Sequence, residues 1–325
     1  MITSRTRETL ERCDLQRGRP SMKRVSTQGW NGIFASVLAV CVLVVIGAGI
    51  LDAATLIIAA APSIREFGVS FLWISVWNPM HHLYGALPFL YGSLLTVSIA
   101  LLLAGAIGVT TAVALTQINV QWLRSMVSLL LEILAVIPSV IYGIWALLVV
   151  APVLVRLSGR TGAASGEFAA SGFGVLTAGV VLGVMVMPTV VALTREAIAS
   201  APKDIAEAAI ALGATRQETV ALAVMPFARR GILGSLYLGL ARAFGEAVAV
   251  SLVIGNQPQI GGSLFARADS LASMLAHALT GVGSPLQTAA VYEIGLLLFL
   301  ITSVFYGLGR AYIARDAISP RLQPW

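Results

Sequence analysis

Residues 200–226 read SAPKDIAEAAIALGATRQETVALAVMP, and they carry the start and stop signals of two short helices. Ser200 is a suitable N-cap, and Pro202 falls in the first turn, where the missing N–H of a proline is tolerated. An alanine-rich helix can then run to Leu212. Gly213 suits the left-handed conformation that ends such a helix. The first half of this stretch therefore predicts a short helix closed by a tight turn.

The second half of the stretch predicts another short helix. Thr215 and Glu218 have the spacing of a capping box, in which each side chain hydrogen-bonds the backbone N–H of the other residue. Pro226 should stop this helix, because a proline disfavours the helical conformation in the residue before it. The first helix has an apolar face at positions i, i+3, i+4 and i+7, formed by Ile205, Ala208, Ala209 and Leu212. This face must pack against the protein's own helix ends or against a partner.

Apolar blocks flank this stretch on both sides. Charged residues make up 11% of the 325 residues, compared with roughly 25% in soluble domains, and hydrophobic residues make up 58%. Open strands would leave backbone groups unpaired in lipid, so blocks that cross a membrane must be helical. Six blocks approach or exceed the length of about 20 residues that a spanning helix needs: 32–58, 91–116, 125–152, 173–195, 231–255 and 289–313. The sequence thus predicts an all-α polytopic membrane protein with six transmembrane helices.

Small residues and prolines inside the blocks predict how these helices pack and bend. Gly179 and Gly183 should let two helix backbones approach closely. Pro138, Pro152 and Pro188 should kink or end their helices.

The distribution of basic residues orients the blocks. Sixteen of the 21 Lys and Arg residues fall in segments that are cytoplasmic if the N-terminus is inside, and four fall in external segments. Both termini are therefore predicted to be cytoplasmic, and Ser171 and Asp269 to be reachable from outside. The predicted parts, in chain order, are a basic cytoplasmic tail 1–31, a first transmembrane helix 32–58, an external loop 59–90, a core of five transmembrane helices 91–313 that includes the cytoplasmic loop 200–226, and a cytoplasmic tail 314–325.

Two opposite charges lie inside the fifth block. Arg242 is near its midpoint, and Glu246 follows four residues later, which in an α-helix places both on one face about 6 Å apart along the axis. The pair is either a structural ion pair between helices or a relay for anions. In a relay, the guanidinium binds phosphate oxygens and the carboxylate accepts a P–OH hydrogen bond that sulfate cannot donate. We favour the relay, because charges within a membrane are usually functional.

The stretch 200–226 resembles the EAA loop of prokaryotic ABC importer permeases. The matching residues are Glu207, Ala208, Ala209, Gly213 and Pro226. The stretch departs from the usual pattern at Ala223 and Met225, where Ile and Leu are common. This resemblance implies a type I ABC importer permease fold and a coupling helix that docks on a separate ATPase.

The chain lacks the lysine of a nucleotide-binding loop. A Walker A loop requires a Gly-Lys pair before Ser or Thr, and neither Lys23 nor Lys203 follows a glycine. We therefore expect that this chain is not an enzyme and needs no cofactor or metal of its own. ATP and Mg²⁺ are expected on the partner ATPase.

Further motifs resemble those of phosphate permeases of the PstC type. They are GLARAFGEAVAV at 239–250, IPSVIYG at 137–143, YGALP at 84–88 and IGN at 254–256. The resemblance implies that Arg242 and Glu246 lie in the substrate path, with Ser139 and Tyr142 as candidate path-lining residues. It also implies a complex in a prokaryotic plasma membrane with a PstA-type sister permease, two copies of an ATP-binding subunit and an external phosphate-binding protein.

Two alternatives stay open at this point. The chain could be a permease for another oxyanion, such as molybdate, tungstate or sulfate, since Arg242 alone would serve any of these. It could instead be a non-transporting membrane subunit in phosphate sensing. Nucleic-acid binding is not expected despite the net charge of +6, because the basic residues lie between apolar blocks.

Overall fold

The structure is a computed structural model that describes residues 28–118, 120–161, 171–278 and 283–318. In this part of the chain the regular elements are helices, and one isolated bridge pairs Asn78 with Leu83. The predicted all-α class is therefore confirmed. The predicted tail 1–31 lies outside the described residues up to residue 27, and the predicted tail 314–325 lies outside them from residue 319.

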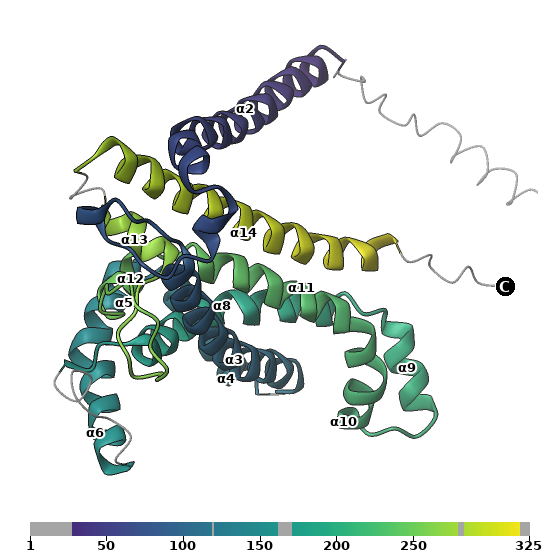
Figure 1. The fold of residues 1–325 in the computed structure, drawn as a ribbon. Coiled ribbons are helices and arrows are strands. Elements are labelled where there is room, and N and C mark those ends of the chain that lie inside the picture. The colour runs from purple at the N-terminus through teal and green to yellow at the C-terminus, as the bar shows by residue number, and fades with distance from the viewer. Residues whose placement is uncertain (1–27, 119, 162–170, 279–282, 319–325) are drawn as a thin grey trace, which may run out of the picture. The chain divides into compact units, whose positions relative to one another are not determined.

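The helices follow one another through the whole described chain (Figure 1). The α-helices are α2 (Gln28–Phe67), α3 (Leu87–Gln117), α4 (Gln121–Val136), α5 (Ser139–Trp145), α6 (Ala151–Thr161), α8 (Val175–Ala199), α9 (Lys203–Ala211), α10 (Arg216–Thr219), α11 (Met225–Phe244), α12 (Val248–Ser251), α13 (Leu271–Ala278) and α14 (Pro285–Ile318). Two short 3₁₀ helices, Gly68–Leu72 and Pro79–His81, lie between α2 and α3, and π-helical turns occur at Ala146–Val150 and Val220–Val224.

The chain divides into two compact units, Met1–Asp52 and Ala53–Trp325. The described part of the first unit is the beginning of α2, which is apolar on all sides, as expected for a helix surrounded by lipid. α2 continues past the predicted end at residue 58 and contains Pro62 before it ends at Phe67. The second unit contains all the other helices.

Five helical segments of the described chain are long and apolar enough to cross a membrane. They are Phe34–Leu72, Leu87–Gln117, Ser139–Gly159, Val175–Ala199 and Pro285–Ala314. Four of these coincide with the first, second, fourth and sixth predicted blocks. The chain is therefore polytopic, as predicted, and the third and fifth blocks differ from expectation.

The third block, 125–152, is not one helix. α4 ends at Val136, and Ile137 and Pro138 adopt extended conformations with ψ of 127° and 142°. Proline forces this on the residue before it, since its ring clashes with a helical neighbour. The apolar segment that can span a membrane therefore starts only at Ser139, and α4 is a separate helix.

The fifth block, predicted to be one helix over 231–255, is also interrupted. α11 ends at Phe244, and residues 245–247 are not helical before the short α12 begins. α11 has the length of a spanning helix, but its 20 residues include Arg229, Arg230 and Arg242. These three charges explain why it is less apolar than the other blocks.

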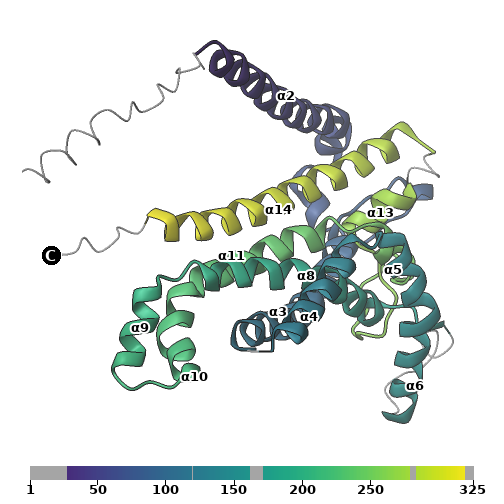
Figure 2. The ribbon, with the colours of Figure 1, turned by 180° about the vertical axis from the view of Figure 1, so that it is seen from behind.

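The core of the second unit is formed where α8 packs against α3 and α11, and α11 in turn packs against α14 (Figure 2). Glycines allow the closest of these approaches. A Cβ at Gly179 would lie 2.7 Å from the Ile99 side chain, and one at Gly183 would lie 3.3 Å from the Cα of Ala100. The predicted role of these two glycines in close helix packing is therefore confirmed. Pro188 lies inside α8 and does not end it.

Candidate substrate path and coupling loop

The predicted helix–turn–helix at 200–226 is present. Gly213 closes α9 with a φ of 91°, in the left-handed region, and Ala214 N–H donates to the Ala209 carbonyl over 3.1 Å. The capping box is confirmed, because Thr215 Oγ1 accepts from Glu218 N–H at 3.3 Å while Glu218 Oε2 accepts from Thr215 N–H at 2.8 Å. These hydrogen bonds from Thr215 hold the pKa of the exposed Glu218 carboxyl below its usual value.

Two predicted boundaries of this loop are wrong. Ser200 does not start α9: it caps the end of α8, its hydroxyl donates to the Ala197 carbonyl, and Pro202 takes the N-cap position of α9. Pro226 does not stop the second helix, because the chain passes through the π-helical turn Val220–Val224 and continues into α11. Such a widened turn relieves the clash between a proline ring and the carbonyl one turn earlier.

One face of the loop is apolar and open among the described residues. Leu212 is 90% exposed and Leu222 76%, and Glu207 and Ala208 are exposed beside them. The opposite face packs Ala206 against a small buried cluster that consists of Ile198, Val224, Ala228 and Ile232. The protein's own helices thus cover one side of α9 only, and Figures 1 and 2 show α9 and α10 lying together beyond the end of α11.

Arg242 lies two residues before the end of α11, and its side chain is exposed. Its Nη1 donates a hydrogen bond to Thr189 Oγ1 on α8 at 3.0 Å. A guanidinium has five N–H donors, and within the described residues the Arg242 guanidinium uses one of them, in this bond to Thr189. Arg242 therefore keeps most of its capacity to bind an anion.

Glu246 does not lie one helical turn beyond Arg242, as the continuous helix predicted. It is half-buried in the non-helical residues 245–247, with its N–H donating to the Ala243 carbonyl. Gly245 ends α11, and no ion pair joins Glu246 to Arg242 in the described part of the chain. The two residues remain neighbours in sequence at a helix break rather than partners on one helix face.

The structure brings the motif at 137–143 against the motif at 239–250. α5 packs on α12, and a Cβ at Gly143 would lie 3.2 Å from the Cα of Ala249 and closer still to Leu252. Tyr142 is buried, donates a hydrogen bond to the Leu134 carbonyl at 2.8 Å and belongs to the same buried cluster as Ala243, the residue after Arg242. Ser139, at the start of α5, is half-buried. Tyr142 is thus near the arginine, whereas no contact of Ser139 with it is seen among the described residues.

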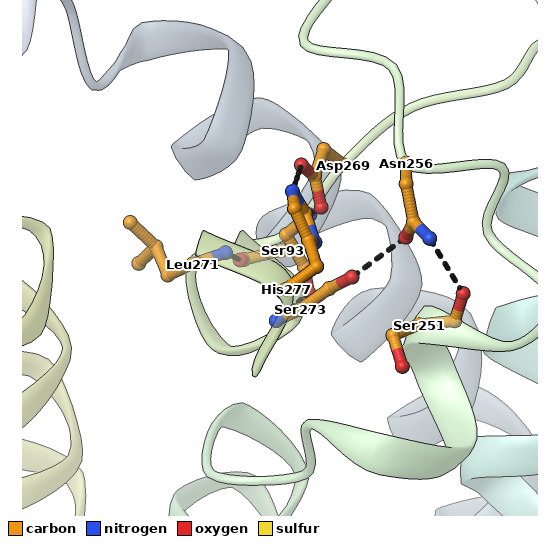
Figure 3. Close-up of polar contacts among 8 residues, drawn as sticks. Ser93, Ser251, Asn256, Asp269, Leu271, Ser273 and His277 are labelled. Atoms are coloured by element: carbon orange, nitrogen blue, oxygen red, sulfur yellow. Dashed lines mark hydrogen bonds and ion pairs between the residues drawn. The ribbon is translucent and has the colours of Figure 1, made fainter. Parts of the chain in front are cut away.

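Sequence reasoning missed a buried polar network between α3, α12 and α13 (Figure 3). Asp269 has no exposed surface, and its Oδ1 accepts from Ser270 N–H at 2.8 Å. His277 Nε2 lies 3.3 Å from Asp269 Oδ2. Ser273 Oγ donates to Asn256 Oδ1 at 2.8 Å, and Asn256, in the left-handed region at a φ of 50°, donates to the Ser251 carbonyl. Ser93 on α3 accepts from Leu271 N–H at 2.9 Å.

Burial sets the protonation of this network. It raises the pKa of Asp269 to about 7, and hydrogen bonds from Ser273 and Ser270 only partly oppose the rise. It also lowers the pKa of His277. The expectation that Asp269 is reachable from outside is therefore wrong, because the 256–270 loop folds back and buries this carboxyl.

A weak sequence signal did exist for the network. Asp269 is the only acidic residue between Glu246 and Glu293, and His277 is the only histidine after the His81–His82 pair. In a chain with few charges, an isolated carboxyl directly before an apolar run indicates a helix cap or a buried partner. Neither residue has a spacing that points to the other.

The chain belongs to the family of binding-protein-dependent transport system inner membrane components, whose family model matches residues 104–316. This range contains the helix–turn–helix at 200–226, Arg242, Glu246 and all of the Asp269 network except Ser93. A chain of the solved structure of the MetNI methionine ABC transporter has a similar fold, with a TM-score of 0.51, 19% identity, and coverage of 68% of this chain and 93% of that chain. The predicted ABC importer permease fold is thus confirmed.

Individual relatives carry a more specific name. The phosphate transport system permease protein PstC of Haemophilus influenzae is 38% identical over 80% of this chain and 86% of its own length. The protein of the same name from Mesorhizobium japonicum is 35% identical over 85% of this chain and 87% of its own length. The resemblance to PstC-type permeases is therefore confirmed.

Proposed function

We propose that this chain is a permease subunit of an ATP-driven phosphate importer and that Arg242 contacts phosphate during its passage. The observation that carries this proposal is the exposed Arg242 guanidinium at the end of α11, which makes a single hydrogen bond within the described chain, to Thr189, beside an unwound segment. Non-helical backbone at membrane depth is tolerated where it lines a polar cavity or is buried in protein. The PstC relatives give the substrate that such a site would serve.

The chemistry of phosphate fits the residues at this break. Arginine binds two oxygens of a tetrahedral oxyanion with parallel N–H donors. Glu246, half-buried in the adjoining segment, is the acceptor for the P–OH group that phosphate retains at neutral pH. Tyr142 and Ser139 line the path on the α5 side. The break also lets Glu246 change position without moving α11.

The partners follow from the open face of α9. We assign Glu207, Ala208, Ala209, Gly213 and Pro226 to coupling with an ATPase, because α9 leaves an apolar face uncovered at the end of the protein where α10 also lies. The complex contains two copies of that ATPase subunit, and these copies bind ATP and Mg²⁺ in place of this chain. A PstA-type sister permease completes the path, an external phosphate-binding protein delivers the substrate, and both termini of this chain are cytoplasmic.

Transport by the assembled complex tests the proposal. The complex is reconstituted in liposomes with ATP on the side of the ATPase, and uptake of radiolabelled phosphate is measured with the binding protein outside. We expect ATP-dependent uptake that arsenate inhibits and that sulfate or molybdate at equal concentration does not. Uptake of molybdate, tungstate or sulfate instead would assign the chain to another oxyanion, and ATP hydrolysis without any anion uptake would favour a sensing subunit.

The coupling role has a separate test in Gly213→Val. The site has open space for a side chain, so the change acts through backbone strain alone, roughly 1–2 kcal/mol at a φ of 91°. We expect normal membrane abundance and weak retention of the ATPase during purification. Gly213→Asn is the matched control, because asparagine tolerates the left-handed conformation and should retain the ATPase. Equal retention by Gly213→Val would remove the support for α9 as the coupling helix.

A further inference from the structure

A second basic site lies at the end of the protein that carries the coupling loop. A pocket of about 520 Å³ opens between the end of α3, the start of α4 and the end of α8. It is lined by Ile118, Gln121, Arg124, Ser125, Ser128 and Arg195. Arg195 lies one turn before the end of α8, and α9 begins four residues after that end, so the pocket is on the α9 side of the protein.

This pocket is separate from the Arg242 site. Thr189 accepts the hydrogen bond from Arg242 and precedes Arg195 on α8 by six residues. This spacing separates the two residues by about 9 Å along the helix axis and places them on different faces of α8. Arg242 does not line the pocket.

The side chains that line the pocket are mainly hydrogen-bond donors. Arg195 Nη1 donates to Ser128 Oγ at 3.1 Å, which orients its guanidinium toward α4. Arg124 is exposed in the pocket wall, and Ser125 and Gln121 add a hydroxyl and an amide. No carboxylate is among the described lining residues, so two guanidinium charges face one cavity without an acidic neighbour in it.

The start of α4 adds to this positive potential. Val120 caps α4 without a side-chain acceptor, so the first backbone N–H groups of this 16-residue helix lack an intrahelical partner. These groups point toward the end of the helix at which Gln121 and Arg124 lie. The positive end of the α4 dipole is therefore at the pocket and favours an anion there.

We propose that this pocket binds a phosphate group between Arg124 and Arg195, supplied either by inorganic phosphate or by the headgroup of an anionic lipid. Two guanidinium groups with flanking hydroxyls match the oxygens of a phosphate group, and both sources present that same chemistry. The lipid source has one further argument. Trp122, adjacent to Gln121, is 68% exposed, and tryptophan is typical of the level of lipid headgroups. This inference goes beyond the transport role of Arg242 and does not depend on it.

Cysteine protection in the assembled complex tests the proposal. Cys13 and Cys41 are replaced by serine, and Ser125→Cys places a thiol in the pocket wall. The rate of labelling by a neutral maleimide is measured in nanodiscs of phosphatidylcholine, with and without inorganic phosphate, and in nanodiscs that also contain phosphatidylglycerol. Arg310→Cys, at an exposed position of α14, is the control position outside the pocket and outside the loop 200–226. Gln121→Cys on the same rim replaces Ser125→Cys if the latter does not assemble.

We expect one of the two phosphate sources to slow labelling in the pocket and neither to slow it at Arg310→Cys. Protection by inorganic phosphate in phosphatidylcholine identifies the soluble anion, and protection only with phosphatidylglycerol identifies the lipid. Arg124→Gln or Arg195→Gln should raise the concentration for half-protection by roughly tenfold, the size of one charge-assisted hydrogen bond. Arg310→Gln, an exposed arginine on α14 outside the pocket, should leave it unchanged.

The proposal is overturned if neither source protects the thiol, or if protection is the same in the two pocket-arginine variants as in Arg310→Gln. Failure of the transport proposal would look different. In that case Arg242→Ala would take up phosphate normally while protection of the pocket thiol persisted. Loss of uptake in Arg242→Ala with unchanged protection is the result expected if both proposals hold.

Discussion

Arg242 and Asp269 are isolated charges in a chain with few charges, but their surroundings are opposite. Arg242 is exposed at the end of α11 and makes one hydrogen bond within the described chain, to Thr189. Asp269 has no exposed surface and is held by Ser270, Ser273 and His277. The arginine has unused donors and is exposed, whereas the carboxyl is enclosed, with Oδ1 hydrogen-bonded to Ser270 N–H and Oδ2 against His277.

This contrast separates two uses of charge in a membrane protein. A side chain that exchanges ligands must keep donors free and accept solvent when no ligand is bound. A buried carboxyl that fixes a loop must keep its partners at all times, because an unpaired buried polar group destabilises the fold. Substitutions at the two residues should therefore act on different quantities, on transport at Arg242 and on stability at Asp269.

The largest effect is expected for Arg242→Ala. Phosphate uptake by the reconstituted complex should fall by roughly 100-fold or more, since two charge-assisted hydrogen bonds to the anion are lost. The melting temperature in detergent should stay near that of the wild type, because the side chain is exposed and its hydrogen bond within the described residues is the single one to Thr189. A large drop in melting temperature would show that Arg242, like Asp269, stabilises the fold, and would contradict the proposed difference between the two residues.

Asp269→Ala should have the converse effect. Removing this carboxyl leaves Ser270 N–H without its acceptor and removes the contact with His277, which should lower the free energy of unfolding by about 3 kcal/mol. Asp269→Asn keeps the size and one acceptor oxygen and should lower it by only about 1 kcal/mol. Thermal unfolding in detergent measures both. Full stability of Asp269→Ala together with lost uptake would show that Asp269 acts in transport.

The pH dependence of stability isolates the Asp269 carboxyl. Its pKa is about 7 in the folded protein and near the ordinary value of about 4 when unfolded, so between these values the folded state holds a proton that the unfolded state has lost. The stabilising contribution therefore falls as pH rises, by up to about 1.4 kcal/mol per pH unit, and is absent above pH 7. The lowered pKa of His277 acts in the opposite direction below about pH 6.5.

The quantity to measure is thus the free energy of unfolding of the wild type minus that of Asp269→Asn, because His277 titrates in both proteins and its contribution cancels. This value should fall steadily from pH 5 to pH 7 and then become constant. A difference that does not change with pH would mean that Asp269 is already ionised in the folded protein.

The smallest effect is expected for Glu246→Gln. The change keeps the size of a half-buried side chain, so stability and assembly should be unchanged. Phosphate uptake should fall by several-fold, about the size of one neutral hydrogen bond, and sulfate should compete better than in the wild type. The swap Arg242→Glu with Glu246→Arg should not restore uptake, because the two positions are not on one helix face. Restored uptake in the swap would indicate an ion pair and not a phosphate contact.

Local signals explain which parts of this fold are predictable from sequence. The turn at Gly213 and the capping box of Thr215 and Glu218 depend on residues within a few positions of one another, and both were predicted correctly. The end of α4 just before Pro138 has an equally local cause, and the prediction that this proline kinks or ends its helix is confirmed. Family motifs predicted the permease fold, which is confirmed, and the residues of the substrate path, which stay a prediction.

The remaining features depend on contacts between distant residues. No proline marks the break at 245–247, where α12 leaves the line of α11 and packs closely on Gly143 of α5. The burial of Asp269 requires the loop after α12 to fold back on α3 and α13, and a polar loop is expected to be exposed unless such contacts are known. The basic pocket likewise joins Arg124 and Arg195, which are 71 residues apart in the chain.

The π-helical turn at Val220–Val224 gives the coupling loop a mechanical property. The chain stays helical from Arg216 to Phe244 with no loop in between, while Figures 1 and 2 show α10 directed away from the axis of α11. α10 and α11 therefore meet at an angle, with the widened turn between them. Arg242 lies about 25 Å from Met225 along α11. If α9 docks on an ATPase, as proposed, a displacement of α9 and α10 would reach α11 through helical backbone, and α11 carries Arg242 near its other end.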